Sequence, residues 1–124
     1  MTNKTIKICE GTTHYLNIDC FHDGSKNEYD LTDFTVLLFM KDVNSSSTDD
    51  ITVKKGTINN NNIVIKIDPK DTINKKEIKY ECRAIAPNND VFHIMCGKII
   101  IDKAEVPINL MIENYPEIKP VLPL

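Results

Sequence analysis

Cysteine and histidine are the side chains of this sequence best suited to ligate a metal or to act as nucleophile and base. The chain has four cysteines and three histidines, and two of them lie close together in Cys20-Phe21-His22. Alternate residues of a strand share a face, so Cys20 and His22 could offer two ligands to one ion. No CxxC, HxxxH or HExxH spacing completes a tetrahedral set. We therefore expect no bound metal and no other cofactor.

The cysteines allow two interpretations. Cys9, Cys20, Cys82 and Cys96 all lie in strand-like segments, and the last three share the apolar phase of their strands. If the strands carrying Cys82 and Cys96 were joined by a three-residue loop, the two thiols would lie opposite each other and could form a disulfide. We favour the other interpretation, reduced thiols packed in the core. A catalytic cysteine needs an adjacent base and an exposed, electropositive setting, which these apolar surroundings do not offer.

Acidic residues are the other chemical candidates. Asp49 and Asp50 are adjacent, and further aspartates stand at Asp19, Asp23, Asp30 and Asp33. Two close carboxylates with separated pKa values are the arrangement of glycosidases, but adjacent aspartates in a polar loop more often keep that loop solvated. The loop NSSSTDD lacks the glycine and glutamate of a calcium-binding EF-hand, and no GxGxxG, P-loop or GxSxG motif occurs. The sequence therefore predicts a protein that is not an enzyme.

The bulk composition is that of an ordinary globular domain. The chain has 124 residues, of which 41% are hydrophobic and 27% are charged, and its net charge is −3. No basic block marks a nucleic-acid surface, and we expect no nucleic-acid partner. No apolar run of about eighteen residues indicates a membrane span, and the N-terminus MTNKTIKICEGTTHY lacks the pattern of a signal peptide. We therefore expect a protein made in a cytoplasm, with no membrane partner.

The segment 77–102 is the clearest structural element and reads as a long β-hairpin. Its first arm, EIKYECRAIA, alternates apolar and charged residues, and PNND supplies the turn. In the second arm we expect Phe92, Ile94 and Cys96 on one face and a bulge at Gly97. This hairpin predicts one buried face and one solvated face.

Shorter strands precede the hairpin. We expect them at residues 5–10, 14–23, 34–42, 51–55 and 63–67. The segment FTVLLFMKD is apolar on both faces and predicts a central strand covered on each side. Residues 68–73 predict one helical turn, with Asp68 as N-cap and Pro69 at the first helical position. About seven short strands with polar turns predict an all-β protein, a single antiparallel β-sandwich.

The C-terminal segment differs in composition from the rest. Residues 1–102 form the predicted sandwich domain, and residues 103–124, the C-terminal arm, contain four of the six prolines among apolar side chains. Prolines at this density exclude a central strand or a long helix, so we expect an extended arm. It should pack along its own sandwich or onto a neighbouring protein. The expected interface anchors are Leu110, Met111, Ile112, Tyr115, Ile118, Val121 and Leu122.

Three segments carry a family resemblance: YDLTDFTVLLFMKD (29–42), ITVKKGTINNNNIVIKIDPKDT (51–72) and EIKYECRAIAPNNDVFHIMCGKIIID (77–102). Their order resembles the immunoglobulin-like β-sandwich modules of bacteriophage virion proteins, such as the N-terminal domain of the baseplate upper protein. In those modules a D-L-T-G turn opens a strand, a later strand ends in a short helical turn, and a hairpin closes the domain. The resemblance covers residues 13–102, and Asp33 stands where glycine is usual.

The resemblance implies an immunoglobulin-like sandwich and a virion structural protein. It implies a location in the tail, the baseplate, a capsid decoration or a head fibre. The module would assemble in the host cytoplasm with other virion proteins, as a homo-oligomer or in many copies on a symmetric particle.

The alternative is a carbohydrate- or receptor-binding sandwich that holds its ligand in loops 23–30, 43–50 and 87–90. Such a site usually needs exposed rings, and the chain has four tyrosines, four phenylalanines and no tryptophan. The plausible candidates for those rings are Tyr15, Phe21, Tyr29 and Tyr115.

Overall fold

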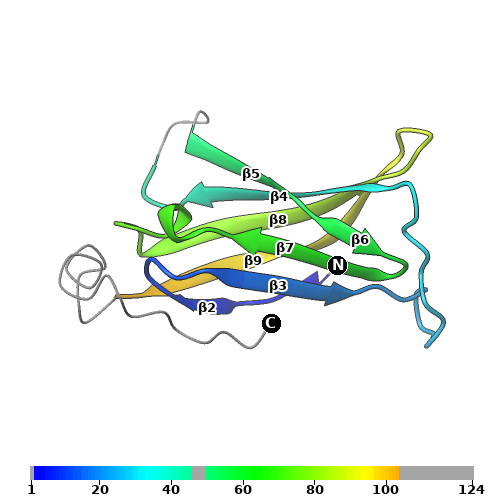
Figure 1. Ribbon diagram of the computed structural model, residues 1–124, viewed down its shortest axis with the longest axis horizontal. Helices are drawn as coiled ribbons and strands as arrows, with labels where there is room; N and C mark the ends of the chain where they lie inside the picture. The colour runs from blue at the N-terminus through cyan, green and yellow to red at the C-terminus, as the bar shows by residue number, and fades with distance from the viewer. Residues whose placement is uncertain (1, 46–49, 104–124) are drawn as a thin grey trace, which may run out of the picture.

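The computed structural model describes residues 2–45 and 50–103, which form two β-sheets packed face to face (Figure 1). The strands are β1 (Thr2–Asn3), β2 (Ile6–Cys9), β3 (His14–Asp19), β4 (Thr35–Asp42), β5 (Ile51–Lys55), β6 (Thr57–Asn59), β7 (Asn62–Ile67), β8 (Glu77–Ile85) and β9 (Val91–Asp102). One short 3₁₀ turn, Pro69–Asp71, precedes β8. The all-β, sandwich-like architecture predicted from the sequence is confirmed.

The larger sheet is mixed, so the expectation of a purely antiparallel sandwich is wrong. Its order is β1-β9-β8-β4-β5, and β2 also pairs with β9. Both β1 and β2 run parallel to β9, with Thr2 opposite Met95 and Ile6 opposite Ile99. The smaller sheet, β3-β7-β6, is antiparallel throughout. The sequence analysis missed β1 and β6 because strands of two and three residues are too short to show alternation.

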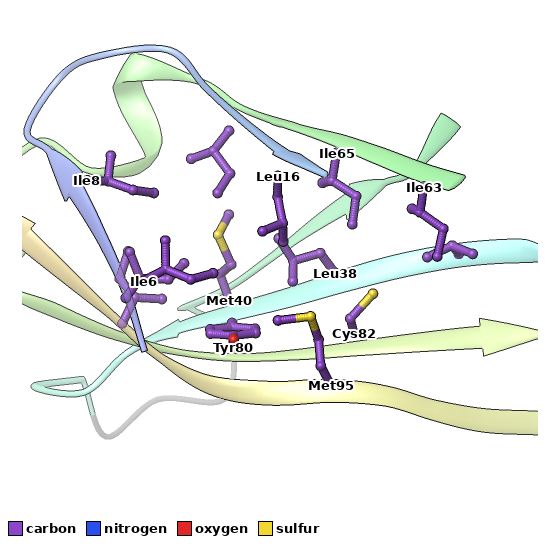
Figure 2. Packing of buried hydrophobic residues seen from close by; sticks show 14 of the residues in the cluster. Ile6, Ile8, Leu16, Leu38, Met40, Ile63, Ile65, Tyr80, Cys82 and Met95 are labelled. Atoms are coloured by element: carbon purple, nitrogen blue, oxygen red, sulfur yellow. The ribbon is translucent and has the colours of Figure 1, made fainter. Parts of the chain in front are cut away.

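The core lies between the two sheets and is built mainly from aliphatic side chains. Figure 2 shows Leu16 and Ile65 of the smaller sheet facing Leu38 and Met40 of the larger one. The period of two along each strand places these residues on the inner face. The buried set also includes Ile6, Ile8, Leu31, Val36, Ile63, Ile67, Ile78, Tyr80, Cys82, Ala84, Met95, Ile99 and Ile101.

Strand β4 occupies the central position expected of it, between β8 and β5. Val36, Leu38 and Met40 on its inner face are buried. On its outer face, Leu37 and Phe39 are only half-buried, and the guanidinium of Arg83 lies 5.8 Å from the Phe39 ring centre. Among the described residues the strand is therefore covered on one side, not on both as its apolar sequence suggested.

The bulge of the closing hairpin lies earlier than predicted. Arg83 pairs with His93 and Cys82 pairs with Met95, so the register passes over Ile94 rather than Gly97. One extra residue reverses which side chains face inward, because the side-chain period of a strand is two. Cys96 therefore pairs with Glu81 and does not lie opposite Cys82. The expected apolar phase of Cys96 is wrong, and no disulfide links the four cysteines.

One strand passes from the larger sheet to the smaller one at Gly56. This glycine separates β5 from β6, and its N–H donates to the carbonyl of Val36 at 2.8 Å. A Cβ at this position would lie 2.8 Å from Cγ2 of Ile63 and 3.2 Å from Cγ1 of Ile65. The absence of a side chain therefore lets the chain cross against the core, and β5-Gly56-β6 closes this side of the sandwich.

The turn between β2 and β3 meets the turn before β8 and the end of β9 at one end of the sandwich, which we call the closed end. The buried Thr72 Oγ1 accepts a hydrogen bond from Gly11 N at 2.8 Å and donates to the carbonyl of Pro69 at 3.2 Å. Lys103 Nζ lies 2.9 Å from Glu10 Oε2 and 3.1 Å from the carbonyl of Lys75. Polar contacts between distant segments therefore fasten this end.

The predicted helical turn is part of the closed end and is confirmed. Asp71, the third residue of the turn, accepts a hydrogen bond from Asp68 N at 2.8 Å. Lys54 Nζ of β5 lies 2.7 Å from both Asp68 Oδ2 and Asp71 Oδ2. Burial alone would lower the pKa of Lys54, but its hydrogen bonds to the two aspartates outweigh that effect and raise it. The turn is thus tied to an edge strand of the larger sheet.

Candidate binding cleft

An open apolar cleft lies at the opposite end of the sandwich, which we call the open end. It has a volume of about 420 Å³ and lies between the end of β3 and the start of β9. We call it the end cleft, and its lining residues are Ile18, Asp19, Cys20, Phe21, Tyr29, Leu31, Phe34, Ala84, Phe92, His93, Ile94 and Met95. A volume of several hundred cubic ångströms with mainly apolar walls is typical of a binding site.

The first wall of the end cleft is the loop that follows β3. Phe21 forms an isolated bridge with Glu28, and Tyr29 N donates to the carbonyl of Cys20 at 3.0 Å. Leu31 is buried and donates its N–H to the carbonyl of Asn60 at 2.8 Å. These bonds hold the loop against the turn between β6 and β7, so the apolar wall is fixed to the smaller sheet.

The D-L-T segment positions the next part of the same wall. Asp30 Oδ1 accepts hydrogen bonds from the Thr32 hydroxyl at 2.6 Å and from Thr32 N at 2.9 Å. The hydrogen bond from the Thr32 side chain, followed by that from its backbone, lowers the pKa of Asp30. Asp33 then adopts a φ of +68°, and the chain turns into β4. The predicted turn before β4 is confirmed.

Aromatic side chains cross the end cleft from one sheet to the other. The ring of His22 lies 4.8 Å from Tyr29, measured between centroids. Tyr29 meets Phe34 edge to face at 6.1 Å, and Phe34 lies 6.3 Å from Phe92 of β9. Separations of this size are typical of interacting aromatic pairs. We call these four rings, from His22 to Phe92, the ring row, and three of them, Tyr29, Phe34 and Phe92, line the end cleft.

The second wall is the start of β9, and both walls have unpaired backbone edges within the described part of the chain. Strand β3 pairs only with β7. Pairing of β1 with β9 begins at Met95, so residues 91–94 of β9 pair only with β8. Unpaired edges offer N–H and C=O groups to an added strand. The end cleft can therefore accept apolar side chains and an extended backbone.

The polar groups near the end cleft do not form a catalytic set. Burial, and then the charge of Asp19, raise the pKa of the Cys20 thiol, and burial raises the pKa of Cys82 to about 12. Thiols with raised pKa values are poor nucleophiles near neutral pH. The Nδ1 atom of His93 is buried without a hydrogen-bond partner among residues 2–45 and 50–103, and its Nε2 lies 3.8 Å from Glu81 Oε1.

The structure separates most of the residues considered for chemistry. His14 begins β3 at the closed end, whereas His22 and His93 lie at the open end. Cys20 and Phe21 line the end cleft, but within the described ranges no group of three or more His, Cys, Asp or Glu could hold a metal ion. Asp49 and the seven predicted anchors of the C-terminal arm lie outside the described residues.

The loops proposed to hold a ligand are also separated. Because β4 and β8 are antiparallel, the loop after Asp42 lies at the end of the sandwich where β8 begins. The hairpin turn 86–90 and the loop 20–34 lie at the other end (Figure 1). Of the four ring candidates, Phe21 and Tyr29 line the end cleft. Sequence reasoning missed Phe34 and Phe92, because both appeared as core positions of their strands.

The fold and the end cleft together define a two-sheet β-sandwich with an apolar binding groove at one end. No protein-family model matches this chain, and no curated protein matches it significantly. Within the described part of the chain, no helix has the length and apolar character required to cross a membrane.

Proposed function

We propose that this chain is a non-enzymatic structural protein of a bacteriophage virion, which assembles through its sheet edges and its C-terminal arm. Its place would be in the tail, the baseplate, a capsid decoration or a head fibre. The partners are other virion proteins and further copies of the chain. Many copies on a symmetric particle would make many weak contacts, which together would give a stable assembly.

The proposal includes an immunoglobulin-like form of the sandwich. The buried Tyr80 stands two residues before the buried Cys82 on the penultimate strand, which is the spacing of the conserved tyrosine and second cysteine in immunoglobulin domains. Its hydroxyl donates at 2.5 Å to the carbonyl of Lys4, a distant residue of the sequence, and so does not form the local hydrogen bond of a tyrosine corner. The positive φ of Asp33 also suits a position where the phage modules have glycine. Both features support the resemblance seen in the sequence.

Apolar side chains exposed beside unpaired strand edges are the observation that carries the proposal. Phe21, just beyond β3, is 50% exposed. On the other side of the molecule, Ile51 and Val53 of the edge strand β5 are 42% and 50% exposed. Proteins that remain alone usually protect such edges with charges or coverage. Apolar edges on two sides suit a protein that is covered by neighbours on both.

A receptor- or carbohydrate-binding role is the second candidate, and the ring row of the end cleft favours it. Phe21, Tyr29, Phe34 and Phe92 line the end cleft, and rings of this kind stack against the apolar faces of sugars. A glycan array probed with the purified chain tests this role. Specific retention of a sugar, abolished by Phe92→Ala, would support it over assembly.

The assembly role is tested by solution mass and by particle composition. Light scattering should show self-association of the full chain and a monomer for a chain that ends at Asp102. Quantitative mass spectrometry of purified particles from a phage that encodes the chain should find it in many copies. Monomers in both forms, together with absence from the particles, would contradict the proposal.

A further inference from the structure

We propose that the end cleft of one copy binds the proline-rich C-terminal arm of a second copy, so that chains join head to tail. This inference rests on the proposed assembly role and names the site that would receive the arm. The first argument is chemical complementarity. The end of the arm reads Pro120-Val-Leu-Pro123, a PxxP spacing, and Pro116 precedes it. Proline-rich segments adopt extended polyproline II conformations and dock in grooves lined by aromatic rings.

The ring row supplies such a groove. Tyr29, Phe34 and Phe92 lie in sequence across the end cleft, with successive centroids 6.1 Å and 6.3 Å apart. Polyproline II has three residues per turn and a rise of about 3.1 Å per residue, so Pro120 and Pro123 lie about 9 Å apart on one face. That distance lets the two prolines contact different rings of the row. The side chains of Val121 and Leu122 would then fill the apolar volume between the sheets.

The point where the arm begins favours a second copy over the same chain. Strand β9 starts beside the end cleft at Val91 and finishes at Asp102, at the closed end (Figure 1). Lys103 is held there by Glu10 and by the carbonyl of Lys75. Phe92 and Asp102 are ten positions apart along the strand, about 33 Å. To enter its own end cleft the arm would have to reverse and run back along this whole length, whereas an arm that continues in the direction of β9 points toward a second molecule.

The length of the arm fits this arrangement. Sixteen residues lie between Lys103 and Pro120, and in an extended conformation this segment spans about 50 Å. The arm can therefore cross the junction between two copies and reach the ring row of the second. A contact between two different surfaces of the same protein is heterologous, so it produces rings or filaments rather than closed twofold dimers.

The test uses full-length variants and a matched control. Phe21→Ser removes one aromatic side chain that lines the end cleft, and Tyr15→Ser removes an equally exposed ring outside it, since the two side chains are 50% and 49% exposed. The arm is disabled by the double substitution Val121→Ser and Leu122→Ser. Sedimentation velocity over a range of protein concentrations measures self-association for each chain. We expect Phe21→Ser and the arm variant to weaken self-association roughly tenfold or more and Tyr15→Ser to leave it unchanged.

Mixing the two defective variants gives the decisive measurement. The Phe21→Ser chain keeps an intact arm, and the arm variant keeps an intact end cleft. Their equimolar mixture should form one-to-one dimers and nothing larger, because only one of the two junctions can form.

Three other outcomes would overturn the inference in distinguishable ways. Equal self-association of Phe21→Ser and Tyr15→Ser would leave assembly standing but place the arm elsewhere. A monomeric wild type that is destabilised both by Phe21→Ser and by the arm variant, but not by Tyr15→Ser, would place the arm in the end cleft of its own chain. If the wild type is monomeric and the Phe21→Ser and Tyr15→Ser variants are equally stable, both this inference and self-assembly fail.

Discussion

The two ends of this sandwich are built from the same strands but are held in different ways. At the closed end, hydrogen bonds and ion pairs join segments far apart in the sequence, such as Gly11 with Thr72 and Glu10 with Lys103. At the open end, the aromatic side chains Tyr29, Phe34 and Phe92 line an open apolar cleft. Polar groups at the first end are satisfied within the chain, whereas apolar surface at the second is left for a partner. Stability and binding are therefore expected to be separable by mutation.

The largest loss of stability is expected where the N-terminal strands run parallel to β9, between the two ends. Gly97 has a φ of +152°, and a Cβ there would lie 2.1 Å from the carbonyl oxygen of Lys4. Because the carbonyl oxygen of Lys4 is a backbone atom, the chain between β1 and β2 must shift to make room for an alanine side chain. We expect Gly97→Ala to lower the free energy of unfolding by about 3–4 kcal/mol in urea titrations.

Gly24→Ala is the control for this prediction. Gly24 also has a positive φ, +68°, but no atom lies within 4 Å of a Cβ at this position. Gly24→Ala should lower the free energy of unfolding by only about 1 kcal/mol, which is the cost of the backbone conformation alone. Equal losses in the two variants would show that the N-terminal strands do not pack on β9 as described.

The next largest effect is expected from the carboxylate that joins the 3₁₀ turn to β5. Asp71 is 4% exposed at its side chain, and its Lys54 partner is 15% exposed. Asp71→Ala leaves a largely buried ammonium with one partner fewer and should cost about 2–3 kcal/mol. Asp68→Ala removes the more exposed partner, and it should cost less. Chemical denaturation of both variants measures the difference, and a larger loss in Asp68→Ala would contradict this view of the closed end.

The sequence predicted the strands and the helical turn of this molecule better than its end cleft. Alternation of apolar residues gave the strands of the core, and Asp68 and Pro69 gave the helical turn, because both signals are local. The extra residue at Ile94 left no trace in the pattern, so Cys96 was assigned to the wrong face. The end cleft was also hidden, because Phe34 and Phe92 look like core positions until the spacing of the two sheets is known. Phe21 and Tyr29 were recognised as exposed rings, but nothing local indicated that they face a cavity.

A smaller effect is expected from the buried hydroxyl of Thr72, which joins the turn before β8 to the turn between β2 and β3. Thr72→Val keeps the volume but removes the acceptor of Gly11 N, which then lies unpaired at the closed end. We expect a loss of about 1–2 kcal/mol in thermal or chemical unfolding. Thr12→Val is the control, because the Thr12 hydroxyl donates to the carbonyl of Cys9 at an exposed position. No difference between the two valine variants would show that this tie does not hold the end.

The charges of the closed end also predict how stability depends on pH. The hydrogen bond from Lys54 lowers the pKa of Asp68 from 3.8, so its contribution is present above that value and is lost as the pH falls below it. The pKa of Lys54 is raised above 10.5, so its contribution is present below that value and is lost as the pH rises through the folded pKa. Lys54→Met should reduce both the alkaline loss and the acid loss, as measured by unfolding free energy against pH. An unchanged profile would contradict the pairing.

The smallest effect on stability is expected at the open end, from one of the rings that form the end cleft. Phe92 is 45% exposed and meets another ring, that of Phe34, at 6.3 Å. Phe92→Ala should therefore lower the free energy of unfolding by about 1 kcal/mol or less. Met95→Ala is the matched control, because Met95 is three residues along the same strand but 6% exposed. Its removal from the core should cost about 2 kcal/mol or more.

A cost for Phe92→Ala as large as that for Met95→Ala would mean that the ring row is part of the core and that the end cleft is closed in solution. The expected difference would show instead that the chain keeps a row of aromatic side chains at its open end which its own stability does not require. Side chains of that kind are explained by what they bind, and the two alanine variants therefore separate a packing role for the ring row from a docking role.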